Sequence, residues 1–169
     1  MNVALIGFMA AGKSTVGRVL ANRLGYGFVD TDEEIVRRTG MEVAELFASK
    51  GEASFRAVEK LVVANASTLN NAVIACGGGV ILDQGNVDTL RGSSTLVLLT
   101  ASFEEILGRV KGDSSRPLLN VEDRESLVAA RLQERAPLYL ATADAVVDTT
   151  SLTPEQVADR VLQLLEGKV

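Results

Sequence analysis

A glycine-rich segment near the start of the chain has the spacing of a phosphate-binding loop. Residues 7–14 read Gly-Phe-Met-Ala-Ala-Gly-Lys-Ser and fit G-x-x-x-x-G-K-[ST] at every fixed position. They lie between an apolar run at 2–6 and an amphipathic pattern at 15–24, the strand–loop–helix order that such a loop requires. Its backbone N–H groups would point at phosphates, Lys13 would reach the β- and γ-phosphates, and Ser14 would bind Mg²⁺. The segment therefore predicts binding of a nucleoside triphosphate.

Two carboxylates, Asp30 and Asp32, follow a second short apolar run at residues 27–30. Because they are two residues apart, they can face the same way at the carboxyl edge of a sheet, where ligands bind in open α/β folds. One of them can support Mg²⁺, while the other holds a substrate hydroxyl and can accept its proton. An aspartate at such a turn can instead cap the following helix, and this alternative stays open.

A few arginines must hold any anionic substrate, because the chain as a whole is acidic. Its formal net charge is −5 at pH 7, which argues against a general nucleic-acid or anionic-membrane surface. Arg56 lies in the first turns of a predicted helix, where its charge opposes the helix dipole, so anion binding is favoured over simple solvation. Arg131 and Arg135 lie four residues apart on one helical face, although either can simply be solvated.

A glycine triplet, Gly77-Gly78-Gly79, directly follows a third apolar run at residues 71–76. Glycines permit a positive φ or a close approach of the backbone to a ligand. A flexible turn is the simpler alternative, but three glycines are more than a turn at this sheet edge needs. We therefore expect the triplet to form part of a ligand pocket.

The residue inventory limits both the chemistry and the compartment. The 169 residues include no histidine, which excludes a histidine base and histidine metal ligands, so the chemistry must use Asp, Glu, Lys, Arg and Mg²⁺. The single cysteine excludes an internal disulfide and fits a reducing compartment. With no signal-type segment and no apolar run of about 18 residues, we expect a cytoplasmic protein without membrane or nucleic-acid partners.

The elements that must position these residues alternate between strand and helix patterns. Further strands are predicted at 95–100 and 145–148, and helices at 15–24, 32–38, 43–48 and 54–69, with two more beginning after Ser102 and Thr153. The last two helix starts have the spacing of a capping box, with Glu105 and Gln156 as the partners. This alternation predicts a single α/β domain over residues 1–169, with helices on both faces of a parallel sheet.

A polar stretch at residues 111–124 lies between the fourth and fifth predicted strands and shows no apolar period. A loop of this length in a compact domain is usually functional or disordered. Because Arg116 is followed there by the apolar run 117–119, we expect a lid that closes over the nucleotide and excludes water. A solvated loop is the alternative.

Together these motifs resemble those of the shikimate kinase family. The resemblance covers essentially the whole chain, with the motifs in the family's order. They are the loop 7–15, Asp30-Thr31-Asp32, Gly51-Glu52-x-x-Phe55-Arg56, Gly77-Gly78-Gly79, Arg116-Pro117-Leu118-Leu119 and Arg135-x-Pro137-Leu138-Tyr139. Ala10-Ala11 departs from the family at positions where a further Gly or Ser is frequent, but neither position is fixed in the motif.

The resemblance implies a three-layer fold like that of the nucleoside monophosphate kinases. The implied sheet has five parallel strands in the order 2-3-1-4-5, with a mobile lid. The implied reaction is transfer of the ATP γ-phosphate to the 3-hydroxyl of shikimate, in aromatic amino acid biosynthesis, with Mg²⁺ as cofactor. We expect a monomeric enzyme whose substrate-binding segment spans about residues 31–60.

The same resemblance assigns roles to individual residues. Lys13, Asp32 and Arg116 would be catalytic, and Ser14 and Asp30 would hold the metal. ATP would be bound by Ala10, Ala11, Gly12, Lys13, Ser14, Thr15, Arg109, Arg116 and Pro154, and shikimate by Asp32, Arg56, Gly77, Gly78, Gly79 and Arg135.

Several of these roles are specific. Arg56 and Arg135 would bind the shikimate carboxylate, and Asp32 its hydroxyls. Arg109 would stack on adenine, and Pro154 would border the adenine pocket. Phe47 and Phe55 would line the substrate region, and Glu59 would orient an arginine.

Three alternatives stay open from the residues alone. A related kinase for gluconate or a nucleoside monophosphate would use the same machinery, and two arginines with an aspartate clamp suit gluconate as well. A catalytically silent relative should lack one of the charged residues named above, yet all are present. A nucleotide switch would need a water-positioning residue and an exposed apolar patch, and the sequence shows neither.

Overall fold

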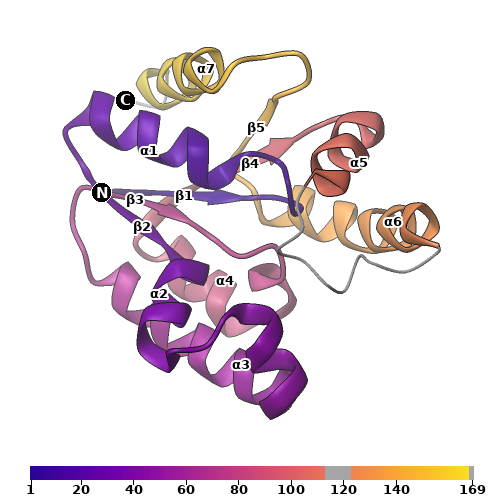
Figure 1. Ribbon diagram of the computed structural model, residues 1–169. Helices are drawn as coiled ribbons and strands as arrows, with labels where there is room; N and C mark the ends of the chain where they lie inside the picture. Colours follow the sequence, from indigo (N-terminus) through magenta and orange to yellow (C-terminus); the bar gives the residue numbers. More distant parts are fainter. Residues whose placement is uncertain (113–122, 168–169) are drawn as a thin grey trace.

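The central element is a five-stranded parallel sheet with the strand order β2-β3-β1-β4-β5. The computed structural model describes residues 1–112 and 123–167 (Figure 1). The strands are β1 (Asn2–Ile6), β2 (Gly27–Asp30), β3 (Ala72–Ala75), β4 (Ser94–Thr100) and β5 (Ala145–Asp148). The fold class and strand order expected from the sequence are confirmed.

Helices cover both faces of this sheet. The helices are α1 (Lys13–Leu24), α2 (Thr31–Thr39), α3 (Val43–Ser67), α4 (Gln84–Arg91), α5 (Phe103–Lys111), α6 (Arg124–Thr142) and α7 (Pro154–Glu166), with a 3₁₀ turn at Val80–Leu82. Figure 1 shows α1 and α7 together on one face and α3, α4 and α6 on the other. The result is the three-layer arrangement typical of parallel sheets.

The central strand β1 is buried on both sides, and its residues alternate between two cores. Val3 and Leu5 pack in the cluster formed with α1 and α7. Ala4 and Ile6 pack in the cluster that includes residues of α3, α4, α5 and α6. This explains why β1 reads as a continuous apolar run rather than as an alternating pattern.

Helix boundaries differ from the sequence expectation at three places. The helices expected at 43–48 and 54–69 are joined as α3, which is interrupted only by Gly51 with φ 82° and ψ 169°. Helix α4 was not expected, because its eight residues are mostly polar and too few to show a helical period. Helix α6 continues past Pro137 to Thr142, although proline usually ends a helix.

Part of the expected lid lies outside the described residues. This part comprises residues 113–122 and includes Arg116. Across the ranges 1–112 and 123–167, none of the helices has both the length and the apolar character needed to cross a membrane.

The packing of α1 on β2 leads to a stability prediction for Gly17. A Cβ atom at this position would lie 2.6 Å from Cε2 of Phe28. We expect Gly17→Ala to lower the free energy of unfolding by about 1–3 kcal/mol, because overpacking outweighs the gain in helix propensity. Urea denaturation followed by circular dichroism measures this.

Gly108→Ala is the matched control for this change. Gly108 is also helical, but no heavy atom of the described residues outside its own helix backbone would lie within 4 Å of a Cβ atom there. The control should raise stability by about 0.5–1 kcal/mol through helix propensity alone. Equal effects of the two substitutions would contradict the packing argument.

Candidate active site

The phosphate loop between β1 and α1 has the backbone geometry that its glycines predict. Gly7 has φ 147° and Gly12 has φ 90°, so both lie where L side chains are strained. Lys13, the first residue of α1, is buried, and its Nζ donates to the carbonyl oxygens of Gly7 and Phe8 at 2.8 Å each. The ammonium group is therefore held over the loop, beside the helix N-terminus where an anion binds.

Ser14 and Asp30 meet at the edge of this loop. The Ser14 hydroxyl donates to Oδ2 of Asp30, while Oδ1 of Asp30 accepts from the backbone N–H groups of Asp32 (2.9 Å) and Glu33 (3.2 Å). Asp30 is therefore also the N-cap of α2, so the capping alternative is confirmed for this residue. Its second oxygen and the Ser14 hydroxyl form a pair of hard oxygen ligands.

This pair suits Mg²⁺ better than a metal that needs a complete protein cage. Within the described parts of the chain, no three or more Cys, Asp or Glu side chains are grouped so as to hold a metal ion. Mg²⁺ usually takes only one or two protein oxygens and completes its shell with waters and substrate phosphates. The Ser14–Asp30 pair beside the phosphate loop fits that requirement.

A second site lies next to the phosphate loop, in a cavity of about 480 Å³. This size is within the range of small-molecule pockets. Its lining includes the apolar residues Met9, Val36, Val43, Ala44, Phe47 and Phe55, the glycines Gly77, Gly78 and Gly79, and the charged residues Asp32, Glu33, Glu42, Arg56, Glu59, Arg131 and Arg135. Three arginines within one small cavity make it suitable for an anion despite the acidic chain.

Arg56 is held in this cavity by acidic neighbours on its own helix. Its Nη1 lies 2.7 Å from Oε1 of Glu59, and its Nη2 lies 3.5 Å from Oε1 of Glu52. Burial raises the pKa of Glu59, the Arg56 charge opposes this rise, and the charges of Asp32 and Asp83 add to it. Among the described residues, Oε2 of Glu59 is buried without a hydrogen-bond partner, so Arg56 is the main source of stabilisation of this carboxylate.

The glycine triplet lies close against these charged groups. A Cβ atom on Gly77 would lie 2.7 Å from Oδ1 of Asp32 and 3.4 Å from Oε2 of Glu59. A Cβ atom on Gly79 would collide with the guanidinium of Arg56. All three glycines line the cavity, so the triplet is placed where a ligand could approach it.

The same triplet brings the cavity against the phosphate loop. A Cβ atom on Gly78 would lie 3.5 Å from the backbone nitrogen of Met9 and 3.6 Å from the carbonyl oxygen of Gly7. The two loops therefore touch, and any ligand in the cavity lies directly beside phosphates bound at the loop. Such adjacency is what direct phosphoryl transfer requires.

Tyr139 connects two parts of the site. It belongs to a motif recognised in the sequence, which gave this tyrosine no role. Its hydroxyl donates to the carbonyl oxygen of Gly78, 61 positions away in the chain. Burial raises the pKa of Tyr139 to about 12, while the charge and a side-chain hydrogen bond of Arg135 oppose the rise. Tyr139 thus connects α6 and Arg135 with the glycine triplet.

The single cysteine lies close to this site but takes no part in it. Cys76 follows β3 and is 2% exposed. Burial raises the pKa of its thiol to about 12, although the Lys13 charge opposes the rise. A thiol so rarely ionised is a poor nucleophile.

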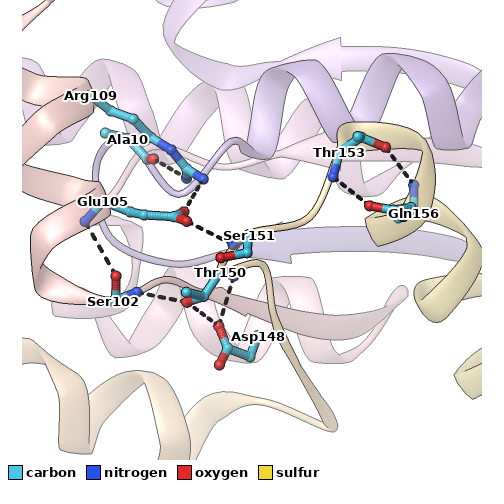
Figure 2. Close-up of polar contacts among 9 residues, drawn as sticks. All are labelled: Ala10, Ser102, Glu105, Arg109, Asp148, Thr150, Ser151, Thr153 and Gln156. Atoms are coloured by element: carbon cyan, nitrogen blue, oxygen red, sulfur yellow. Dashed lines mark hydrogen bonds and ion pairs between the residues drawn. The ribbon is translucent and has the colours of Figure 1, made fainter.

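Arg109, in α5, contacts the phosphate loop but lies outside the cavity lining. Figure 2 shows its Nη1 donating to the carbonyl oxygen of Ala10 (2.9 Å) and its Nη2 paired with Oε2 of Glu105 (2.6 Å). The second oxygen of Glu105 accepts from the backbone N–H of Ser151 at 2.7 Å. The capping box expected at Ser102 is therefore only half formed, because Glu105 has these two partners instead.

The second expected capping box is complete. Thr153 Oγ1 accepts from the Gln156 N–H, and the Gln156 side chain accepts from the Thr153 N–H, with Pro154 as the first residue of α7. Of the remaining site residues, Ala11 is buried, Thr15 is exposed in the first turn of α1, and Arg116 lies outside the described residues.

Comparisons with known proteins agree with this geometry. The family model described as shikimate kinase matches residues 9–166. A shikimate kinase from Thermodesulfovibrio yellowstonii is 42% identical over 98% of this chain and 95% of its own length. Another from Caldanaerobacter subterraneus is 44% identical over 96% of this chain and 94% of its own length.

Solved structures give the same result. The shikimate kinase from Acinetobacter baumannii in complex with shikimate has a TM-score of 0.95 and 37% identity, covering 99% of this chain and 93% of that one. The shikimate kinase from Aquifex aeolicus has a TM-score of 0.86 at 37% identity, with coverage of 99% and 98%. A phosphate loop touching an arginine-lined cavity, in a fold and sequence matched over nearly the full length, shows that this chain belongs to the shikimate kinase family.

Proposed function

We propose that this chain transfers the γ-phosphate of ATP to the 3-hydroxyl of shikimate, giving shikimate 3-phosphate for aromatic amino acid biosynthesis. The observation that carries the proposal is the contact between the phosphate loop and the arginine-lined cavity, at Gly78. We propose one kinase domain over residues 1–169, with residues 31–60 as the substrate segment and about 111–124 as the lid. It would act as a cytoplasmic monomer with ATP and shikimate as its small-molecule partners.

On the nucleotide side, Lys13 neutralises the β- and γ-phosphates while the loop N–H groups of residues 10–15 bind their oxygens. The buried ammonium supports this role, because its hydrogen bonds to two loop carbonyls fix its position before the nucleotide arrives. Ser14 and Asp30 would hold Mg²⁺, which neutralises charge on the phosphates when bound. Arg109 and Pro154 would hold the adenine, and Arg116 would reach the transferred phosphoryl group.

On the acceptor side, Arg56 and Arg135 bind the carboxylate of shikimate. A planar guanidinium suits a carboxylate because it donates two parallel hydrogen bonds. Asp32 holds the accepting hydroxyl and can take its proton, and its position beside Gly77 supports this role. Because the transition state of phosphoryl transfer is loose, orientation by Asp32 matters at least as much as early proton removal.

A coupled ADP-release assay tests the function directly. Shikimate, gluconate and AMP are offered separately as acceptors, with ATP and Mg²⁺ in excess. We expect turnover with shikimate only. Turnover with gluconate or AMP and none with shikimate would show that shikimate is the wrong acceptor, although the chain would still be a kinase.

Lys13→Ala should abolish most of the shikimate-dependent ADP release. Loss of one preorganised charge-stabilising contact costs on the order of 10²–10³ in rate. Lys50→Ala, which removes an exposed lysine outside the cavity lining, is the control and should retain wild-type turnover. If Lys13→Ala stayed within threefold of wild type, the role of the phosphate loop would be wrong.

Arg56→Ala and Arg135→Ala should weaken shikimate binding and leave ATP binding almost unchanged. Each loses a charge-assisted contact worth about 1.5–3 kcal/mol, measurable by calorimetry with shikimate and with ADP. The lysine variants should recover only part of the affinity, because an ammonium cannot replace the planar fork. Arg37→Ala is the control, since Arg37 is exposed and pairs with Glu34 at 2.6 Å, outside the cavity lining. If these variants bound shikimate normally but no longer bound ADP, the two pockets would have been assigned the wrong way round.

Asp32→Asn and Asp30→Asn should fail in different ways. Asp32→Asn should lower turnover by about 10²-fold or more with little change in shikimate affinity, and excess Mg²⁺ should not restore it. Asp30→Asn should raise the Mg²⁺ concentration needed both for turnover and for tight ADP binding. Its fold should be preserved because asparagine caps helices as well as aspartate does. Rescue of Asp32→Asn by Mg²⁺, with Asp30→Asn inactive throughout, would exchange the two roles.

A further inference from the structure

One residue of the phosphate loop, Ala10, has a backbone conformation that residues with a side chain rarely adopt. Its φ is 60°, in the left-handed region where the Cβ atom crowds the following carbonyl oxygen. Ala10 is the third residue of a four-residue turn, which is closed by the N–H of Ala11 donating to the carbonyl oxygen of Phe8 at 3.3 Å. A turn with positive φ at its third position usually has glycine there. The loop expected to bind phosphates is therefore strained at Ala10.

Such strain persists only where neighbouring groups hold the residue in place. Figure 2 shows Nη1 of Arg109 donating to the carbonyl oxygen of Ala10 at 2.9 Å, while Glu105 holds the same guanidinium through Nη2 at 2.6 Å. The peptide that joins Ala10 to Ala11 is thus hydrogen-bonded both at its carbonyl and at its N–H. Within the described residues, Arg109 is the one side chain that hydrogen-bonds to Ala10.

The strained conformation decides where one donor of the loop points. Among the residues that the structure describes, the N–H groups of Met9, Ala10 and Gly12 donate no hydrogen bond, so they remain for an anion. If Ala10 relaxed to a negative φ, the peptide between Met9 and Ala10 would turn over, which is how turn types II and I differ. The N–H of Ala10 would then point to the opposite side. Relaxation of the strain would therefore remove one donor from the phosphates.

We propose that Arg109 is a positioning residue for phosphate binding, because it holds Ala10 in the strained conformation that directs this N–H. The inference rests on the proposed function and extends it, since that function gives Arg109 a contact with the base only. A role in positioning the loop is separable from a role at the base. An anion that has phosphates and no base should still depend on Arg109.

Inorganic tripolyphosphate is the probe, because it has the phosphates of ATP without the base or the sugar. Its inhibition constant against ATP is measured in the ADP-release assay, with shikimate saturating and free Mg²⁺ fixed. Arg109→Ala should raise this constant by about tenfold, the effect expected for loss of one charge-assisted hydrogen bond. The KM for shikimate should stay unchanged, because Arg109 lies outside the cavity lining.

A second substitution separates positioning from simple attraction between charges. Removing an arginine weakens anion binding by itself, wherever its guanidinium is near the anion. Ala10→Gly makes the positive φ free of strain, so the loop no longer needs to be held. In the Ala10→Gly background, Arg109→Ala should raise the inhibition constant by about threefold or less, whereas independent effects would multiply unchanged.

Two matched controls accompany these variants. Arg23→Ala removes the same charge from the last turn of α1, where Arg23 pairs with Asp159, and should leave the inhibition constant unchanged. Asn71→Gly relaxes another positive φ, of 56°, just before β3 at the edge of the sheet opposite the phosphate loop. In that background, Arg109→Ala should have its full effect.

The outcomes that overturn the inference differ from those that overturn the function. An unchanged inhibition constant in Arg109→Ala, with a raised KM for ATP, would confine Arg109 to the base and leave the function intact. Equal rises with and without Ala10→Gly would reduce Arg109 to an attracting charge. Failure of tripolyphosphate to compete with ATP in an active wild type would also reject the inference. A wild type without shikimate-dependent ADP release would overturn the proposed function itself.

Discussion

The parallel pairing of β1 with β3 is the constraint on which the site depends. Leu5 is aligned with Ala75, and the first N–H after β3, that of Cys76, donates to the carbonyl oxygen of Leu5 at 3.0 Å. Because the two strands run in the same direction and end together, the phosphate loop and the glycine triplet must leave the sheet side by side. The contact of Gly78 with Met9 and Gly7 follows from this pairing. A one-residue slip in register would separate the two loops and turn each strand residue toward the other core.

The cavity shows how an acidic protein can hold an anion. Arg56 is placed between two glutamates, of which Glu59 is 1% exposed. These acids reduce the net charge around the arginine, but they fix its guanidinium before any ligand arrives, so less side-chain entropy is lost on binding. Glu59 in turn depends on Arg56, because burial disfavours its charge and one of its oxygens has no hydrogen-bond partner within the described ranges of the chain. Arg56 thus stabilises the ionised form of Glu59, and Glu59 holds the guanidinium of Arg56 in place.

The sequence predicted the parts of the structure that are fixed by local chemistry. The phosphate loop, the buried strands and the caps at Asp30 and Thr153 depend on residues within a few positions of one another, and all were found. Strand order came from the resemblance to a family, because periodicity alone carries no information about which strands are neighbours. Contacts between distant segments could not be predicted, as Tyr139 with Gly78 shows. The capping box at Ser102 formed only in half for a related reason. Ser102 caps the helix, but the Glu105 side chain binds Arg109 and the distant Ser151 N–H instead of the Ser102 N–H.

The burial of Cys76 has a practical consequence for measurements of motion. It is the only cysteine in the chain, and its thiol is inaccessible and almost never ionised at neutral pH. Maleimide dyes and nitroxide spin labels react with thiolates, so they should label the native protein very little. A cysteine introduced at an exposed position such as Lys50 would be labelled selectively, without first removing the native one. Distances between two such probes could then follow the molecule through its catalytic cycle with its interior chemistry unaltered.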